Sequence, residues 1–233
     1  MIEIKDAVKV YKKIRALDGL TVNIDEGKIT VLLGLNGVGK STTLKAIMGL
    51  VKLNKGEIFV DGEKVGAKSY NKIALVPDIQ THYAYMTIKE AFKYMDTFYI
   101  NWDMEKAYEM LKDFKLDIDS KISSLSKGNI ARVKLILGFA QNPKYLLLDE
   151  PFSGIDIFTR EVFISSMLKY MTEDMAVLLT THEIKEIENL ADDVILISDG
   201  KLISKFNAQE LKEEEGLSIV DKMREVYKNE IYS

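Results

Sequence analysis

Residues 29–50 read ITVLLGLNGVGKSTTLKAIMGL, an apolar run followed by a glycine-rich turn and a helical pattern. This order predicts a buried strand over 29–33 and a helix after the turn. Glycines suit the turn because successive backbone N–H groups must all point at one anion, which takes unusual dihedral angles and close backbone approach. The spacing G-x-x-x-x-G-K-[ST] of a phosphate-binding loop is met by Gly34, Gly39, Lys40 and Ser41.

Two side chains of this loop predict a nucleotide as the ligand. Lys40 adds a mobile positive charge for the β- and γ-phosphates, and the Ser41 hydroxyl can ligate Mg²⁺ that arrives with the nucleotide. The alternative is a chance match to a four-position pattern. The predicted strand before the loop and the predicted helix after it favour ATP-type binding with Mg²⁺.

Composition excludes several classes of protein. The chain has 233 residues, 47% hydrophobic and 29% charged, which is typical of a soluble globular protein. Its 32 basic and 36 acidic side chains give a net charge of −4, so nucleic acid is not an expected partner. Cysteine is absent, which excludes disulfides and thiolate metal sites. No apolar run of about 18 residues and no secretory leader is visible, so we expect a chain that neither spans a membrane nor is exported.

Hydrophobic periodicity predicts an α/β protein. An antiparallel layer precedes the phosphate loop, a helical region spans 77–142, and strands return after it. A charged helical tail is expected over 208–233. The expected strands are 2–10, 20–24, 29–33, 57–60, 73–76, 145–148, 176–180, 194–197 and 201–206. The expected helices are 88–99, 104–116, 130–140, 156–171 and 184–190.

The sequence YLLLDEP at 145–151 predicts a buried parallel strand that ends in two carboxylates. Consecutive side chains of a strand point to opposite faces, so Asp149 and Glu150 can separate. One is expected to reach the water shell of the metal, and the other to act as general base on the attacking water. The alternative is an ordinary strand end with surface acids, which the phosphate loop in the same chain disfavours.

Three further features are ambiguous on their own. Tyr11 ends the first expected strand, where packing is commoner than base stacking. His182 follows a buried strand, where it can hydrogen-bond a γ-phosphate and the attacking water, although a lone histidine is more often structural. The polar segment 124–129 precedes a helix and is either a simple cap or an anion site.

Taken in order, these motifs resemble the nucleotide-binding ATPase subunit of ATP-binding cassette (ABC) transporters, over residues 1–208. GLNGVGKST at 34–42 is similar to the Walker A loop of that family, LSKGN at 125–129 to its signature sequence, and YLLLDE at 145–150 to its Walker B motif. SGID at 153–156 resembles the D-loop, and His182 matches the switch histidine. The resemblance implies adenine stacking by Tyr11 and nucleotide contacts by Gly34, Asn36, Gly37, Gly39, Lys40, Ser41, Thr42, Ser126 and Gly128.

Two segments depart from the family pattern. The signature usually reads LSGGQ, whereas Lys127 and Asn129 stand here in place of a glycine and the glutamine. The family places its Q-loop glutamine after the residue matching Pro77, where this chain has Asp78, with Gln80 two residues later. The resemblance then assigns to Asp78 a contact with a metal-bound water.

The resemblance also implies a P-loop NTPase (RecA-like) fold with an antiparallel β subdomain and an inserted helical subdomain. The whole chain, 1–233, is then one ABC ATPase domain. Its core and β layer span 1–76 and 143–208, its helical subdomain spans 77–142, and its tail spans 209–233. Two ATPase subunits, of the same or different chains, are expected to dimerise head to tail around ATP.

A separate transmembrane permease subunit is implied as the partner, which places the chain in the cytoplasm, on the inner face of the cell membrane. The segments VPD, YMTIKE and NWD most resemble ATPases of small bacterial export systems, including bacitracin-type resistance exporters.

Two alternatives stay open. A non-transport cassette ATPase of translation or DNA maintenance generally carries two cassettes or a coiled-coil insertion, and neither is visible in the sequence. A regulatory subunit that binds ATP with weak turnover is motivated by Asp78 and the altered signature. Glu150 and His182 argue against the second alternative.

Overall fold

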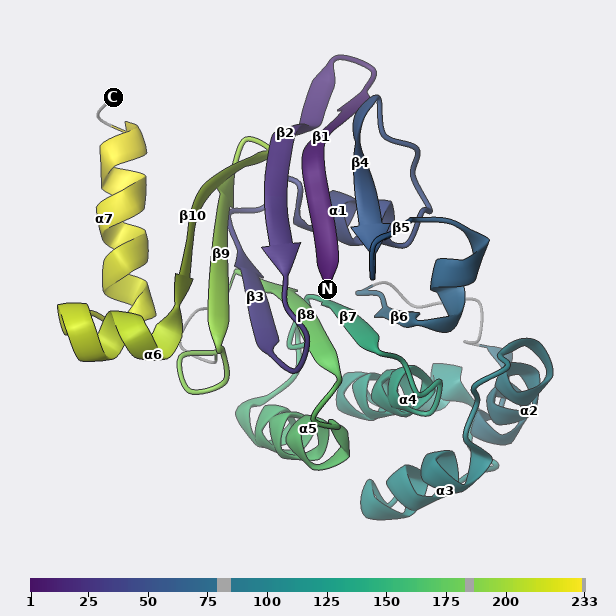
Figure 1. Cartoon of the computed structure of the whole chain (residues 1–233). Helices are drawn as coiled ribbons and strands as arrows, with labels where there is room; N and C mark the ends of the chain where they lie inside the picture. The colour runs from purple at the N-terminus through teal and green to yellow at the C-terminus, as the bar shows by residue number, and fades with distance from the viewer. Residues whose placement is uncertain (79–84, 183–186, 232–233) are drawn as a thin grey trace. The chain divides into compact units, whose positions relative to one another are not determined.

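The computed structural model describes residues 1–78, 85–182 and 187–231, with side chains up to residue 227 (Figure 1). The chain forms two compact units. The first comprises Met1–Ser69 and Ala176–Ser233, and the second comprises Tyr70–Met175. The finer division into core, helical subdomain and tail stays a prediction.

An antiparallel sheet forms the first part of the first unit, in the strand order β2-β1-β4-β5. Its strands are β1 (Ile2–Tyr11), β2 (Ile14–Ile24), β4 (Lys55–Val60) and β5 (Glu63–Lys64). The expected start of the second strand at residue 20 was wrong by six residues. A tight hairpin pairs Tyr11 with Ile14, and Lys12 at φ 54° makes the turn, so β2 begins at once. The short strand β5 was not predicted.

A second, mainly parallel set of strands carries the phosphate loop. It contains β3 (Ile29–Leu33), β8 (Ala176–Thr181), β9 (Asp193–Ser198) and β10 (Lys201–Asn207), in the order β10-β9-β3-β8. β3 runs parallel to both of its neighbours and is buried along its whole length. This confirms the buried strand that the apolar run predicts. The helix α1 (Lys40–Ile47) begins directly after the loop.

The C-terminal segment is helical, as predicted, and packs within the first unit. It consists of α6 (Ala208–Glu210), a π-helical turn (Leu211–Glu215) and α7 (Ile219–Ile231), which lies near β10 in Figure 1. The Tyr227 hydroxyl of α7 donates a hydrogen bond to the backbone carbonyl of Ile197, at 3.1 Å. The helix expected over 184–190 lies partly outside the described residues, and residues 187–190 form a turn.

The second unit combines two parallel strands with helices. β6 (Ile73–Val76) pairs with β7 (Tyr145–Asp149) in parallel, residue by residue from Ile73 opposite Tyr145. The helix α4 packs against β6, α3 and α5. A short 3₁₀ turn at Ala67–Asn71 begins in the first unit and ends in the second, and another lies at Ile122–Ser124. The helices are α2 (Ile88–Phe98), α3 (Met104–Asp113), α4 (Lys127–Phe139) and α5 (Ile157–Tyr170).

The helix starts of this unit follow from capping side chains. Thr87 and Glu90 form a reciprocal capping box at α2, and Asp103 caps α3. The expected start of α4 at residue 130 was wrong, because the Ser126 hydroxyl accepts the N–H of Asn129 and the helix begins at Lys127. Among the described residues, no helix has both the length and the apolar character needed to cross a bilayer.

Candidate functional site

The predicted phosphate loop closes around its own lysine. The Lys40 side chain is buried, and its Nζ donates hydrogen bonds to the backbone carbonyls of Gly34, at 2.8 Å, and Leu35, at 3.3 Å. Gly39, at φ 113°, precedes the first turn of α1. The ammonium group is therefore held inside the loop, at the N-terminus of a helix, where an anion is favoured.

Close backbone approach explains two of the glycines. A Cβ on Gly34 would lie 2.6 Å from the carbonyl oxygen of Ile197, and one on Gly39 would lie 2.2 Å from that of Ala16. The turn between β9 and β10 joins the same cluster, because the Gly200 N–H donates to Val38 O at 3.1 Å. Sequence reasoning missed Ala16, Ile197 and Gly200, since only the fold brings them to the loop.

The other first-unit candidates occupy the loop, α1 and two strand ends. Asn36 and Gly37 are exposed at the tip of the loop, and Ser41 and Thr42 lie half-buried in the first turn of α1. Tyr11 ends β1 with 41% of its surface exposed, and the Lys9 ammonium lies 4.8 Å from its ring centroid. His182 follows β8 directly and is exposed.

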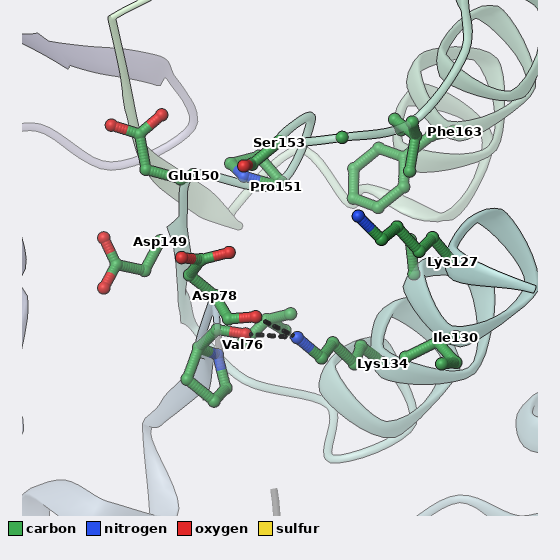
Figure 2. A pocket seen from close by; sticks show the side chains of 14 residues that line it. Val76, Asp78, Lys127, Ile130, Lys134, Asp149, Glu150, Pro151, Ser153 and Phe163 are labelled. Carbon is green, nitrogen blue, oxygen red and sulfur yellow. Dashed lines mark hydrogen bonds between the residues drawn. The ribbon is translucent and has the colours of Figure 1, made fainter. Parts of the chain in front are cut away.

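The acidic candidates of the second unit line one pocket, a cavity of about 230 Å³ beside α4 (Figure 2). Asp149 is the last residue of β7 and is buried, whereas Asp78 lies two residues after β6. Two lysines of α4, Lys127 and Lys134, line the same cavity. The structure thus brings together Asp78, Asp149 and Glu150, whereas Gln80 lies outside the described residues.

The conformation of Glu150 corrects the expectation that Asp149 and Glu150 point to opposite faces of one strand. β7 ends at Asp149, and Glu150 lies outside the strand in the left-handed region, at φ 45°. A non-glycine residue there is sparsely populated and is found where surrounding structure requires it, often at functional sites. The left-handed turn at Glu150, and not the pleat of the strand, therefore sets the direction of the Glu150 side chain.

The signature-like segment forms the N-terminal end of α4. Ser126 is the exposed N-cap, and Gly128 lies in the first turn, where a Cβ would come within 2.8 Å of Thr159 Cγ2. The Lys127 ammonium reaches toward Gly154, and lies 3.5 Å from where a Cβ on that glycine would stand. Lys127 therefore extends into the pocket of its own chain.

Comparison with known proteins is consistent with these motifs. The protein family described as "ABC transporter" matches residues 17–153. The SkfA peptide export ATP-binding protein SkfE of Bacillus subtilis (strain 168) is 31% identical over 221 residues, which cover 92% of each chain. The ABC transporter ATP-binding protein YtrB of the same organism is 30% identical over 217 residues, 92% of this chain and 74% of YtrB.

Solved structures agree in fold. The structure of an ATP-binding subunit of an ABC transporter has a TM-score of 0.84 and 26% identity, and 98% of both chains are covered. A dimeric ATP-binding cassette in a post-hydrolysis state, bound to ADP and phosphate, has a TM-score of 0.79 and 27% identity, over 89% of this chain and 99% of the other. The expected P-loop NTPase fold is confirmed. The chain belongs to the ABC transporter family and is an ATP-binding ATPase subunit of it.

Proposed function

We propose that this ATPase subunit dimerises head to tail around ATP and drives a separate transmembrane permease subunit that exports its substrate. The main support is the position of Glu150, which follows the end of β7, has a left-handed backbone conformation and lines the acidic pocket. A carboxylate held outside its strand suits a general base that polarises the attacking water. Export is supported by the names of two relatives, SkfE at 31% identity and a lipopolysaccharide export ATP-binding protein of Escherichia coli at 27%.

The phosphate loop binds the nucleotide in this proposal. Lys40 exchanges its loop carbonyls for the β- and γ-phosphates, and the loop N–H groups stabilise the charge that spreads over the γ-phosphoryl group. Tyr11 offers an exposed ring for the adenine, and His182 contacts the γ-phosphate and the attacking water. Backbone and hydroxyl contacts with the nucleotide complete the set: Gly34, Asn36, Gly37, Gly39, Ser41 and Thr42.

The residues present fit Mg²⁺ as a companion of the nucleotide. Within the described part of the chain, no three carboxylate, histidine or cysteine side chains gather to hold a metal ion by themselves. Mg²⁺ usually takes one or two protein oxygens and completes its shell with phosphates and water. Each unit supplies hard oxygen donors of this kind, the Ser41 hydroxyl in the first unit and the carboxylates of Asp149 and Asp78 in the second. When bound with the nucleotide, Mg²⁺ would neutralise charge on the phosphates.

A second subunit completes each nucleotide site in this proposal. Ser126 is exposed at the start of the 13-residue helix α4, with Gly128 beside it, so these residues are available to the γ-phosphate held by a partner cassette. ATP then lies in the interface, and hydrolysis releases the dimer, which is a switch between two affinities. The permease partner places the subunit on the cytoplasmic face of the cell membrane.

The test compares Glu150→Gln with a matched control, Glu161→Gln, which makes the same change at an exposed position of α5. Loss of the general base should lower ATP turnover by about 10²- to 10⁴-fold and leave ATP binding intact. Mg²⁺-dependent ATPase activity is measured across protein concentration, with oligomeric state followed in parallel. Glu150→Gln should accumulate as an ATP-bound dimer, and Glu161→Gln should behave like the wild type.

Each other outcome removes a definite part of the proposal. Wild-type turnover in Glu150→Gln would exclude Glu150 as the base. Turnover strictly proportional to protein concentration, with no ATP-dependent dimer, would exclude the self-assembled site. ATP binding without turnover in the wild type would favour the regulatory subunit.

A further inference from the structure

Lys134 joins α4 to the segment that follows β6. Its side chain points from the helix into the acidic pocket, and its Nζ donates hydrogen bonds to two successive backbone carbonyls (Figure 2). The distances are 2.8 Å to Pro77 O and 2.6 Å to Asp78 O. Two charge-assisted bonds from one side chain fix the chain direction at the point where Asp78 enters the pocket.

The same ammonium group stands among carboxylates. Burial lowers the pKa of Lys134, and the negative charges of Asp78 and Asp149 act in the opposite direction. Asp78, Asp149 and Glu150 all line the cavity, and the first two act electrostatically on Lys134. A cation close to a carboxylate favours its charged form. The second lysine, Lys127, reaches instead toward Gly154. Lys134 is thus placed to offset the charge of Asp78 and Asp149.

We propose that Lys134 is a positioning residue for ATP hydrolysis, which holds Asp78 at the pocket and compensates its charge beside Asp149. The inference rests on the proposed function for the reaction itself, but the pairing of Lys134 with Asp78 is a property of the fold. It assigns a role to a helix residue that no motif marks.

A double-mutant cycle between Lys134→Met and Asp78→Asn tests the pairing without any activity. Both changes keep side-chain size and remove charge, and Asp78→Asn leaves the two backbone carbonyl acceptors in place. Coupling between the two changes must therefore come from the carboxylate. We expect a coupling of about tenfold in the unfolding equilibrium constant, or about 1.4 kcal/mol. Lys93→Met, at an exposed position of α2, is the lysine control and should show no coupling.

ATPase measurements on the same variants test the role in the reaction. Lys134→Met should lower kcat about tenfold and leave ATP affinity near the wild-type value, whereas in the Asp78→Asn background it should change kcat less than about threefold. Lys134→Arg, which keeps the charge and the donors, should restore most of the activity. A scaffolding role alone would lower kcat equally in both backgrounds.

The outcomes separate this inference from the proposed function. The pairing would be overturned if Lys134→Met had the same effect on unfolding and on turnover in the wild type and in the Asp78→Asn background. The ATPase proposal would still stand. If the two changes were coupled in the unfolding equilibrium but the wild type did not turn over ATP, the pairing would stand. The role of Lys134 in hydrolysis would then be overturned. Should Lys134→Met fail to fold, Lys134→Gln keeps a donor without the charge and carries the same comparison.

Discussion

The phosphate loop of the first unit and the acidic pocket of the second unit are built by different means. Backbone atoms in close approach shape the loop, with Gly34 against Ile197 and Gly39 against Ala16. Charged side chains from distant parts of the chain line the pocket, where the Lys134 ammonium donates to the backbone carbonyl of Asp78, 56 positions away. The loop, shaped by close backbone contacts, tolerates almost no added atom. The pocket, lined by charged side chains, depends on the balance of those charges.

The largest effect is expected at Gly39, which has both a positive φ and a backbone atom in close approach. Gly39→Ala would place a Cβ 2.2 Å from Ala16 O at a φ of 113°, so strain and overlap add. We expect a loss of about 3 kcal/mol or more in stability, together with loss of ATP binding. Thermal unfolding and nucleotide titration measure both quantities.

Gly37 supplies the matched control for this prediction. It lies in the same loop at φ 87°, but a Cβ there meets no atom within 4 Å. Gly37→Ala should cost only the left-handed strain, about 1 kcal/mol. Equal losses in the two variants would show that strain alone, and not backbone approach, shapes the loop.

An intermediate effect is expected at Gly34, compared with Gly138 in the second unit. A Cβ on Gly34 would meet the fixed carbonyl of Ile197 at 2.6 Å, whereas one on Gly138 would meet side-chain carbons of Val76, at 2.7 Å, and Leu146. Gly34→Ala should therefore cost about 1 to 3 kcal/mol. Gly138→Ala should cost less than about 1 kcal/mol, because side chains can shift and alanine favours the helix. Denaturant titrations decide, and a larger loss at Gly138 would reverse the contrast.

The smallest effect is expected at the exposed ion pair of Lys169 and Asp113 in the second unit. Hydrogen bonds from Lys169 and Tyr170 lower the pKa of the Asp113 carboxyl. Burial, together with the hydrogen bond to Asp113, raises the pKa of the Tyr170 hydroxyl to about 12. A lowered carboxyl pKa stabilises the fold above the unfolded value of about 3.9, and this stabilisation is lost as pH falls through the folded value.

Lys169→Met should accordingly raise the pKa of Asp113 and weaken the pH dependence of stability below about pH 4. Carboxyl chemical shifts followed by NMR measure the pKa directly. Because the charged groups of Lys169 and Asp113 are exposed, solvent screens their interaction, and the change in stability at neutral pH should be slight. A large loss at neutral pH would show that surface charges hold this unit as firmly as the pocket charges do.

The sequence predicts the loop far better than the pocket, and the reason is physical. The strand β3 was predicted residue for residue, because its apolar run and the following glycines are local signals. The start of α4 was misplaced because a serine cap competes with apolar periodicity, and the left-handed turn at Glu150 has no local signal. The contact from Lys134 to Pro77 and Asp78 depends on which helix face meets β6, which only the folded chain decides.

Trp102 gives the molecule a built-in optical probe. It is the single tryptophan of the chain, and its ring lies 5.7 Å from that of Phe92 in the second unit. Its fluorescence therefore reports on the packing of α2 and its surroundings, whereas circular dichroism averages over both units. Recorded together during heating, the two signals would reveal whether the units melt as one cooperative body or in succession.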